Sequence, residues 1–129
     1  MTAEPVNGDA GEPWPTSLNY DPETKTLRVV FNAGDAVDLA AEYLRVESPS
    51  AEVQGHSPSE RQIVPGCRHV GIIGIEPVGN YAVRLLFDDL HDTGIYSWRY
   101  LHELGREYAA RWQRYIDALE TRGLSRDPK

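Results

Sequence analysis

Residues 79–101 constrain the fold more than any other part of the chain. They run from an apolar strand into a loop rich in Asp and His, and from there straight into the aromatic start of a helix. A second apolar segment, residues 70–78, comes just before them, and turn-forming residues separate the two segments. Gly79 or Asn80 can take the positive φ that a tight turn needs. The sequence therefore predicts an antiparallel hairpin that leads through residues 88–94 into a helix.

A second hairpin is predicted nearer to the N-terminus. Residues 26–31 alternate between apolar and more polar side chains, as in a strand with one buried face. Residues 32–35 supply turn chemistry, and residues 36–39 return as a second short strand. One or two helical turns are expected at 40–46. Residues 48–66 are rich in Ser, Pro, Gly and Glu and lack periodicity, so we expect a long surface loop there.

The last third of the chain has the pattern of an amphipathic helix. Gly105 interrupts a helical pattern that begins at Ser97, which predicts a bend or a fresh start. Gly123 stands where a C-terminal cap is expected. The predicted fold is α+β, with a small, mainly antiparallel β-sheet built from hairpins and packed against the C-terminal amphipathic helix. The apolar face of that helix consists of Tyr108, Trp112, Tyr115, Ile116 and Leu119.

The length of the chain predicts one domain. With 129 residues it can bury a single core but cannot hold a separate catalytic domain as well. Residues 1–15 are expected to form a flexible acidic tail, residues 16–123 the domain, and residues 124–129 a short tail.

The charge of the chain narrows the range of partners. The net charge is −7 and basic residues are scattered, so neither nucleic acid nor an acidic membrane surface is expected as a partner. Another protein is expected instead, and a homodimer stays open. The N-terminus lacks the features of a signal peptide, and Cys67 is the sole cysteine. A cytoplasmic location is therefore expected.

Two motifs together carry a resemblance to a known family. The motifs are residues 79–101 and Leu44-Arg45 followed by Ser48-Pro49-Ser50-Ala51-Glu52. Over roughly residues 17–121 the chain resembles the N-terminal domain of gamma-butyrobetaine hydroxylase and trimethyllysine hydroxylase. It also resembles the stand-alone bacterial proteins of the DUF971 type, which consist of that domain alone.

The resemblance implies an accessory role. In the family this domain precedes a 2-oxoglutarate and iron-dependent catalytic domain, occurs alone, or is attached to P-loop ATPases that carry iron–sulfur clusters. It therefore implies a non-catalytic accessory or protein-interaction domain linked to iron or iron–sulfur metabolism. The catalytic half of the hydroxylases is absent from this sequence, so their activity is not implied.

The family's zinc site, of three cysteines and one histidine, is altered in this chain. His91 matches the histidine, whereas Ser48, Ser50 and Val53 match the three cysteines, and Leu90 replaces a neighbouring glycine. One histidine and two hydroxyls do not make a closed zinc site. No cofactor is therefore expected. A weak divalent-metal site, for iron or zinc, stays open as a second hypothesis, with His91 as a ligand and Asp88, Asp89 and Asp92 as additional ones.

No catalytic residues are predicted. Cys67 precedes Arg68 and His69, but a third group that would orient the histidine is not evident. A lone cysteine beside a strand is more often a packing residue. A small enzyme of unknown reaction is therefore the third hypothesis, after an interaction domain and a metal-binding domain.

A set of aromatic and arginine residues predicts an interaction surface, because interfaces favour these residue types. For Tyr96 and Trp98, packing of the helix start onto the sheet is the alternative. The candidate surface consists of Arg45, Asn80, Tyr81, Tyr96, Arg99 and Tyr100.

Overall fold

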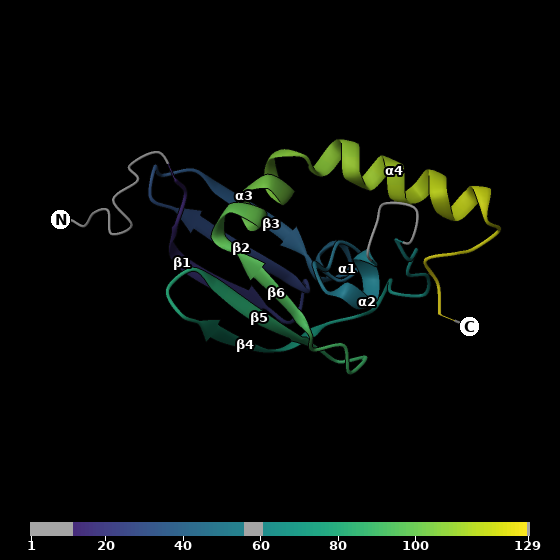
Figure 1. Ribbon diagram of the computed structural model, residues 1–129, viewed down its shortest axis with the longest axis horizontal. Helices are drawn as coiled ribbons and strands as arrows, with labels where there is room; N and C mark the ends of the chain where they lie inside the picture. The colour runs from purple at the N-terminus through teal and green to yellow at the C-terminus, as the bar shows by residue number, and fades with distance from the viewer. Residues whose placement is uncertain (1–11, 56–60, 129) are drawn as a thin grey trace.

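The computed structural model describes residues 12–55 and 61–128 (Figure 1). Residues 1–11, most of the predicted acidic tail, lie outside this part of the chain. No helix among the described residues is long and apolar enough to cross a membrane. The elements follow in the order β1 (Pro15–Asp21), β2 (Thr26–Phe31), β3 (Ala36–Ala40), α1 (Ala41–Val46), α2 (Ala51–Gln54), β4 (Ile72–Val78), β5 (Ala82–Phe87), β6 (Gly94–Ser97), α3 (Trp98–Arg106) and α4 (Tyr108–Thr121).

The strands form two antiparallel sheets of three strands each, in the orders β1-β2-β3 and β4-β5-β6. The α+β class is confirmed, and both predicted hairpins are present as β2–β3 and β4–β5. Gly79 takes the expected positive φ, of 54°, in the second of these turns. The sequence did not indicate β1 or β6, which complete the two sheets.

The two sheets share one hydrophobic core because their inward side chains belong to the same buried cluster. Each fully buried Leu or Phe in it contributes about 2 kcal/mol relative to an exposed one. The helices α3 and α4 close one side of this core, and α4 runs along the top of Figure 1. The buried side chains include Leu27, Val29 and Phe31 of the first sheet, Val83, Leu85, Phe87 and Tyr96 of the second, Leu101 and Leu104 of α3, and Tyr115 and Leu119 of α4.

Gly105 serves close packing and does not interrupt a helix. The helix α3 continues through it to Arg106, and the next helix starts at Tyr108. A Cβ at Gly105 would come within 2.4 Å of Val37 Cγ1, so only glycine lets α3 approach β3 this closely. The break in the helical pattern is therefore real, but it lies two residues later than the glycine that suggested it.

The expected surface loop at 48–66 is partly wrong. Ser48, Ser50 and Val53 are buried, and α2 lies within this segment. Ser50 caps α2, because its Oγ accepts a hydrogen bond from the backbone N–H of Glu52 at 3.2 Å. Residues 56–60 of the expected loop lie outside the described residues.

Candidate functional site

His91 lies in the β5–β6 loop with its ring buried, and the residue is only 7% exposed. Its Nε2 atom is 2.9 Å from Ser48 Oγ, and its Nδ1 atom is 3.2 Å from Glu52 Oε1. Glu52 accepts a hydrogen bond only if Nδ1 carries the proton, so Ser48 then donates to Nε2. Both ring nitrogens of His91 are therefore satisfied within the protein.

Neighbouring hydroxyls extend this arrangement. Ser50 Oγ is 2.7 Å from Thr93 Oγ1, and Thr93 in turn donates to Glu52 Oε1 at 3.3 Å. The backbone N–H of Ser50 donates to Ser48 Oγ at 3.2 Å. We call Ser48, Ser50, Glu52, His91 and Thr93 the His91 cluster. It joins α2 and the chain just before it to the loop between β5 and β6.

Tight packing holds the His91 cluster in place. A Cβ at Gly94 would come within 2.6 Å of Ser48 Oγ, so a glycine is needed at this position to admit the serine. Burial lowers the pKa of His91 below its ordinary value, and the nearby Arg45 guanidinium acts in the same direction. The imidazole is therefore held neutral, as a buried hydrogen-bonded ring requires.

The aspartates of the metal hypothesis do not surround the His91 ring. Asp89 pairs with Arg45 Nε at 2.8 Å and accepts a hydrogen bond from the backbone N–H of His91. Asp92 lies 3.9 Å from Arg84, and Asp88 is exposed. Within residues 12–55 and 61–128, no group of three or more His, Cys, Asp or Glu side chains is placed to hold a metal ion.

The hydrogen bonds of the His91 cluster link a hydroxyl, an imidazole and a carboxylate in the sequence found in a catalytic triad. Ser48, His91 and Glu52 stand in the relation that serine hydrolases use. A nucleophile must be reached by its substrate, however, and Ser48 is 0% exposed. The chain of hydrogen bonds therefore stabilises the fold and offers no accessible nucleophile.

Cys67 is the other candidate nucleophile, and it is buried as well. Burial raises the pKa of its thiol to about 11, so the thiolate is scarcely populated at neutral pH. Arg68, which could have lowered this pKa, pairs with Asp127 instead. Cys67 belongs to the hydrophobic core, in agreement with the packing interpretation.

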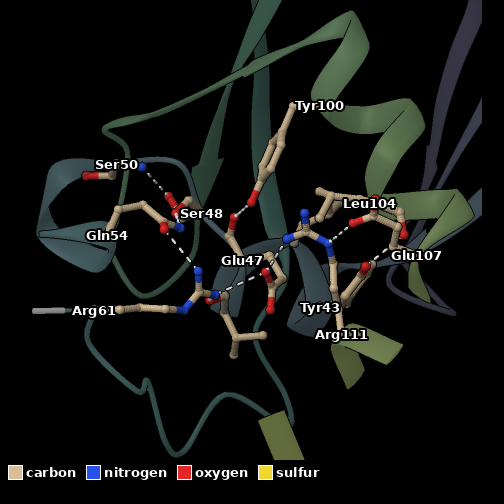
Figure 2. Close-up of polar contacts among 12 residues, drawn as sticks. Tyr43, Glu47, Ser48, Ser50, Gln54, Arg61, Tyr100, Leu104, Glu107 and Arg111 are labelled. Atoms are coloured by element: carbon tan, nitrogen blue, oxygen red, sulfur yellow. Dashed lines mark hydrogen bonds and ion pairs between the residues drawn. The ribbon is translucent and has the colours of Figure 1, made fainter. Parts of the chain in front are cut away.

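A second polar cluster centres on Glu47, which follows the last residue of α1 (Figure 2). The carboxylate of Glu47 is buried. It receives Arg61 at 3.0 Å and Arg111 of α4 at 2.8 Å. Arg61 also donates to Gln54 Oε1, and Gln54 Nε2 donates to the backbone oxygen of Ser48 at 2.7 Å. This network, which we call the Glu47 cluster, thus reaches the backbone of the His91 cluster.

Little in the sequence indicates the Glu47 cluster. Glu107 and Arg111 are spaced four apart on α4 and form a 2.9 Å ion pair that helical spacing could have suggested. Nothing local connects Glu47 with Arg61 or Arg111, because Arg61 lies in the segment before β4 and Arg111 lies on α4, so that only the folded chain brings them to Glu47.

The residues of the predicted interaction surface do not form one surface. Tyr96 is fully buried, so packing onto the sheet is the correct interpretation for it. Arg45 is largely buried beside Asp89, and Tyr100 is half-buried with its hydroxyl on the backbone oxygen of Glu47. Asn80, Tyr81 and Arg99 are exposed. Tyr96 and Arg45 differ from the prediction because their positions on β6 and α1 face inward.

The comparisons with known proteins agree with the resemblance found in the sequence. The model of the family described as gamma-butyrobetaine hydroxylase-like, N-terminal, matches residues 18–102. The chain belongs to this family. No curated protein matches it.

Three solved structures show the same fold. Two solution NMR structures are 43% and 40% identical to the chain, with TM-scores of 0.79 and 0.80. They cover 92% and 99% of the chain, and the alignments span 94% and 92% of their own lengths. A crystal structure of a DUF971-family protein with unknown function from Acidithiobacillus ferrooxidans is 37% identical, with a TM-score of 0.60. That match covers 70% of this chain and 91% of the other.

Proposed function

We propose that this chain is a non-catalytic accessory domain that acts by binding another protein in the cytoplasm. The observation that carries the proposal is a contrast within one loop. His91, whose imidazole could act as an acid, a base or a metal ligand, is buried with both ring nitrogens hydrogen-bonded. The adjacent Leu90 is 85% exposed. Buried, satisfied polar groups serve the fold, whereas Leu90 belongs to a set of four large apolar side chains that are exposed on β4-β5-β6 and its loops, and such a patch favours contact with a partner.

Family membership supports the same function. The family model describes a domain named for its place at the N-terminus of a hydroxylase, and it matches residues 18–102 of this chain. A link to iron or iron–sulfur metabolism rests on the resemblance alone. It belongs to the proposal as the setting in which the partner is sought.

Proximity labelling in the source cells tests this function. The tagged chain is expressed at its native level, and we expect a small set of proteins to be labelled reproducibly above a tag-only control. Ser48→Ala is a matched variant, because it removes the hydroxyl that a hydrolase would need while it leaves the protein surface unchanged. The same partners should be labelled with this variant.

A second measurement addresses catalysis directly. A fluorophosphonate probe reacts with accessible, activated serines, so we expect no labelling of the purified wild-type protein at Ser48. Covalent labelling that disappears in Ser48→Ala would contradict a non-catalytic role. The absence of any specific partner in the cells would contradict the interaction role.

A further inference from the structure

Exposed apolar side chains gather on one of the two sheets. Of the large hydrophobic residues that are exposed in the described part of the chain, all but Tyr108 lie within β4-β5-β6 or its connecting loops. The set consists of Ile73, Tyr81, Leu90 and Ile95.

The strand register places two isoleucines on either side of β5. Ile95 of β6 pairs with Arg84 of β5, and it is 44% exposed. On the other flank, the register of β4 shifts between Ile72 and Gly74, and Ile73 at this bulge is 68% exposed while Ile72 is buried. A bulge turns a side chain away from its regular direction, which here exposes an apolar one.

The centre of this outer face is apolar as well. Leu86 alternates with the buried Leu85 and Phe87, so it points away from the core. A Cβ at Gly74 would lie 3.5 Å from three carbons of the Leu86 side chain, so Leu86 covers the glycine on the neighbouring strand. We call Ile73, Leu86 and Ile95, together with Leu90 of the adjoining β5–β6 loop, the outer apolar face.

Leu90 stands out within this set because its backbone is strained. Its φ of 75° lies in the left-handed region, which costs a residue with a Cβ about 1 kcal/mol or more. At 85% exposure the side chain gains almost nothing from the core in return. Strain of this kind is typical of functional positions, since the fold does not benefit from it.

The other sheet shows that exposed sheet faces in this protein need not be apolar. On β2 and β3, Arg28 and Asp38 face each other in an exposed 3.0 Å ion pair. Asn19 of β1 is exposed opposite Arg28. A solvated face of this type is the ordinary solution for an antiparallel sheet with one side in water.

Charges on the outer apolar face define the partner's chemistry. Arg84 lies between Glu76, at 2.5 Å, and Asp92, at 3.9 Å. Two carboxylates against one guanidinium leave this face acidic, and the whole chain has a net charge of −7. Such a field attracts basic partners and disfavours a second copy of the same acidic chain.

We propose that the outer apolar face is the docking surface for a segment of another protein that combines apolar side chains with Lys or Arg. This inference rests on the proposed function and specifies where and what the domain binds. Leu90 and the two isoleucines enter the apolar part of the contact, and Glu76 and Asp92 attract the basic groups.

The experiment selects binders from a random peptide library displayed on yeast. The targets are the wild-type chain and the triple variant Ile73→Ser/Leu90→Gly/Ile95→Ser, whose three sites are exposed and should leave the fold intact. Circular dichroism and an amide NMR spectrum verify that both fold. A control variant, Arg28→Ser/Asp38→Ser, alters the polar face of the other sheet. Sedimentation velocity on each protein reports self-association.

We expect wild-type binders rich in basic and apolar residues, with an affinity that falls as salt rises. The triple variant should weaken their binding on the order of tenfold or more, and the control variant should leave it unchanged. Peptides that bind the triple variant equally well, or that carry no basic residues, would overturn the proposal. A dimer that the triple variant disperses would overturn it too, because the occupant would then be a second copy.

The proximity-labelling experiment, repeated with the triple variant, separates the two proposals. Partners that persist in the triple variant would refute the outer apolar face but not the interaction role. Partners that are missing even from the wild-type chain would refute the interaction role itself.

Discussion

His91 and Leu90 are neighbours in one loop, yet the structure treats them in opposite ways. The His91 ring is buried, with partners for both nitrogens, and its neutral form is favoured. Leu90 points into solvent on a strained backbone. The polar residue supports the fold, whereas the apolar one lies in solvent and does not.

The same contrast extends over larger regions. The Glu47 cluster and the His91 cluster use charged and polar groups inside the protein, where each of these groups must be paired. The outer apolar face leaves isoleucine and leucine in water. This division predicts that substitutions in the clusters lower stability, whereas substitutions on the face change binding without lowering stability.

Glu47→Ala should have the largest effect, because it leaves Arg61 and Arg111 without their shared carboxylate in a mostly buried site. We expect the free energy of unfolding to fall by about 3 to 5 kcal/mol, measured by urea denaturation. Glu107→Ala is the matched control, since that carboxylate also pairs with Arg111 but is more exposed, and its effect on the free energy of unfolding should be much smaller. Equal losses in the two variants would remove the distinction between buried and exposed pairs.

His91→Ala should cost about 2 kcal/mol of unfolding free energy. The change deletes hydrogen bonds to Ser48 and Glu52 and a ring contact with Phe87. His69→Ala, at an exposed position, should leave the denaturation midpoint unchanged. A His91→Ala protein as stable as the wild type would show that the His91 cluster does not support the fold.

The pH dependence of stability should reveal the neutral state of His91. Its pKa is lowered in the folded protein, chiefly by burial, so the unfolded chain binds the proton more readily. The stability that neutral His91 contributes is therefore fully present above the ordinary histidine pKa of about 6.5. It is lost progressively as pH falls from this value to the lower pKa of the folded state. Denaturation at several pH values should show a smaller loss on acidification for His91→Gln than for the wild type. The same or a steeper loss in the variant would contradict a lowered pKa.

Leu90→Gly should stabilise the protein slightly while removing a residue of the outer apolar face. Glycine takes positive φ without strain, and the leucine side chain contributes little burial, so we expect a gain of about 1 kcal/mol or less. Leu90→Ala keeps the strain and should give no gain. Thermal melts of both variants make the comparison, and destabilisation by glycine would show that Leu90 serves the fold.

Metal ions should leave the melting temperature unchanged. Nitrogen atoms of His91 already have protein partners, and the described residues contain no other group of ligands placed for a metal. Melting curves of the purified chain with zinc, iron, manganese or a chelator should coincide. A stoichiometric metal whose removal unfolds the chain would restore the metal hypothesis in place of the His91 cluster.

The sequence predicted much of the fold and little of the polar interior. The alternation at 26–31 and the turn at Gly79 were sufficient for the two hairpins. Neither pattern could show that the hairpins belong to separate sheets, because alternation gives the face of a strand and not its neighbours. The short strand β6 was not predicted because its aromatic residues run directly into those that start α3.

The sequence by itself determined the family, the α+β class and, with Cys67 as its sole cysteine, the absence of a metal cage built from several thiolates. Only the tertiary structure decided that Ser48 meets His91 across 43 residues of chain, and that His91 turns inward while Leu90 turns outward. Local patterns reflect the backbone and the nearest turns. The direction of a loop side chain is decided by the distant groups that satisfy or exclude it, and those groups come together only on folding.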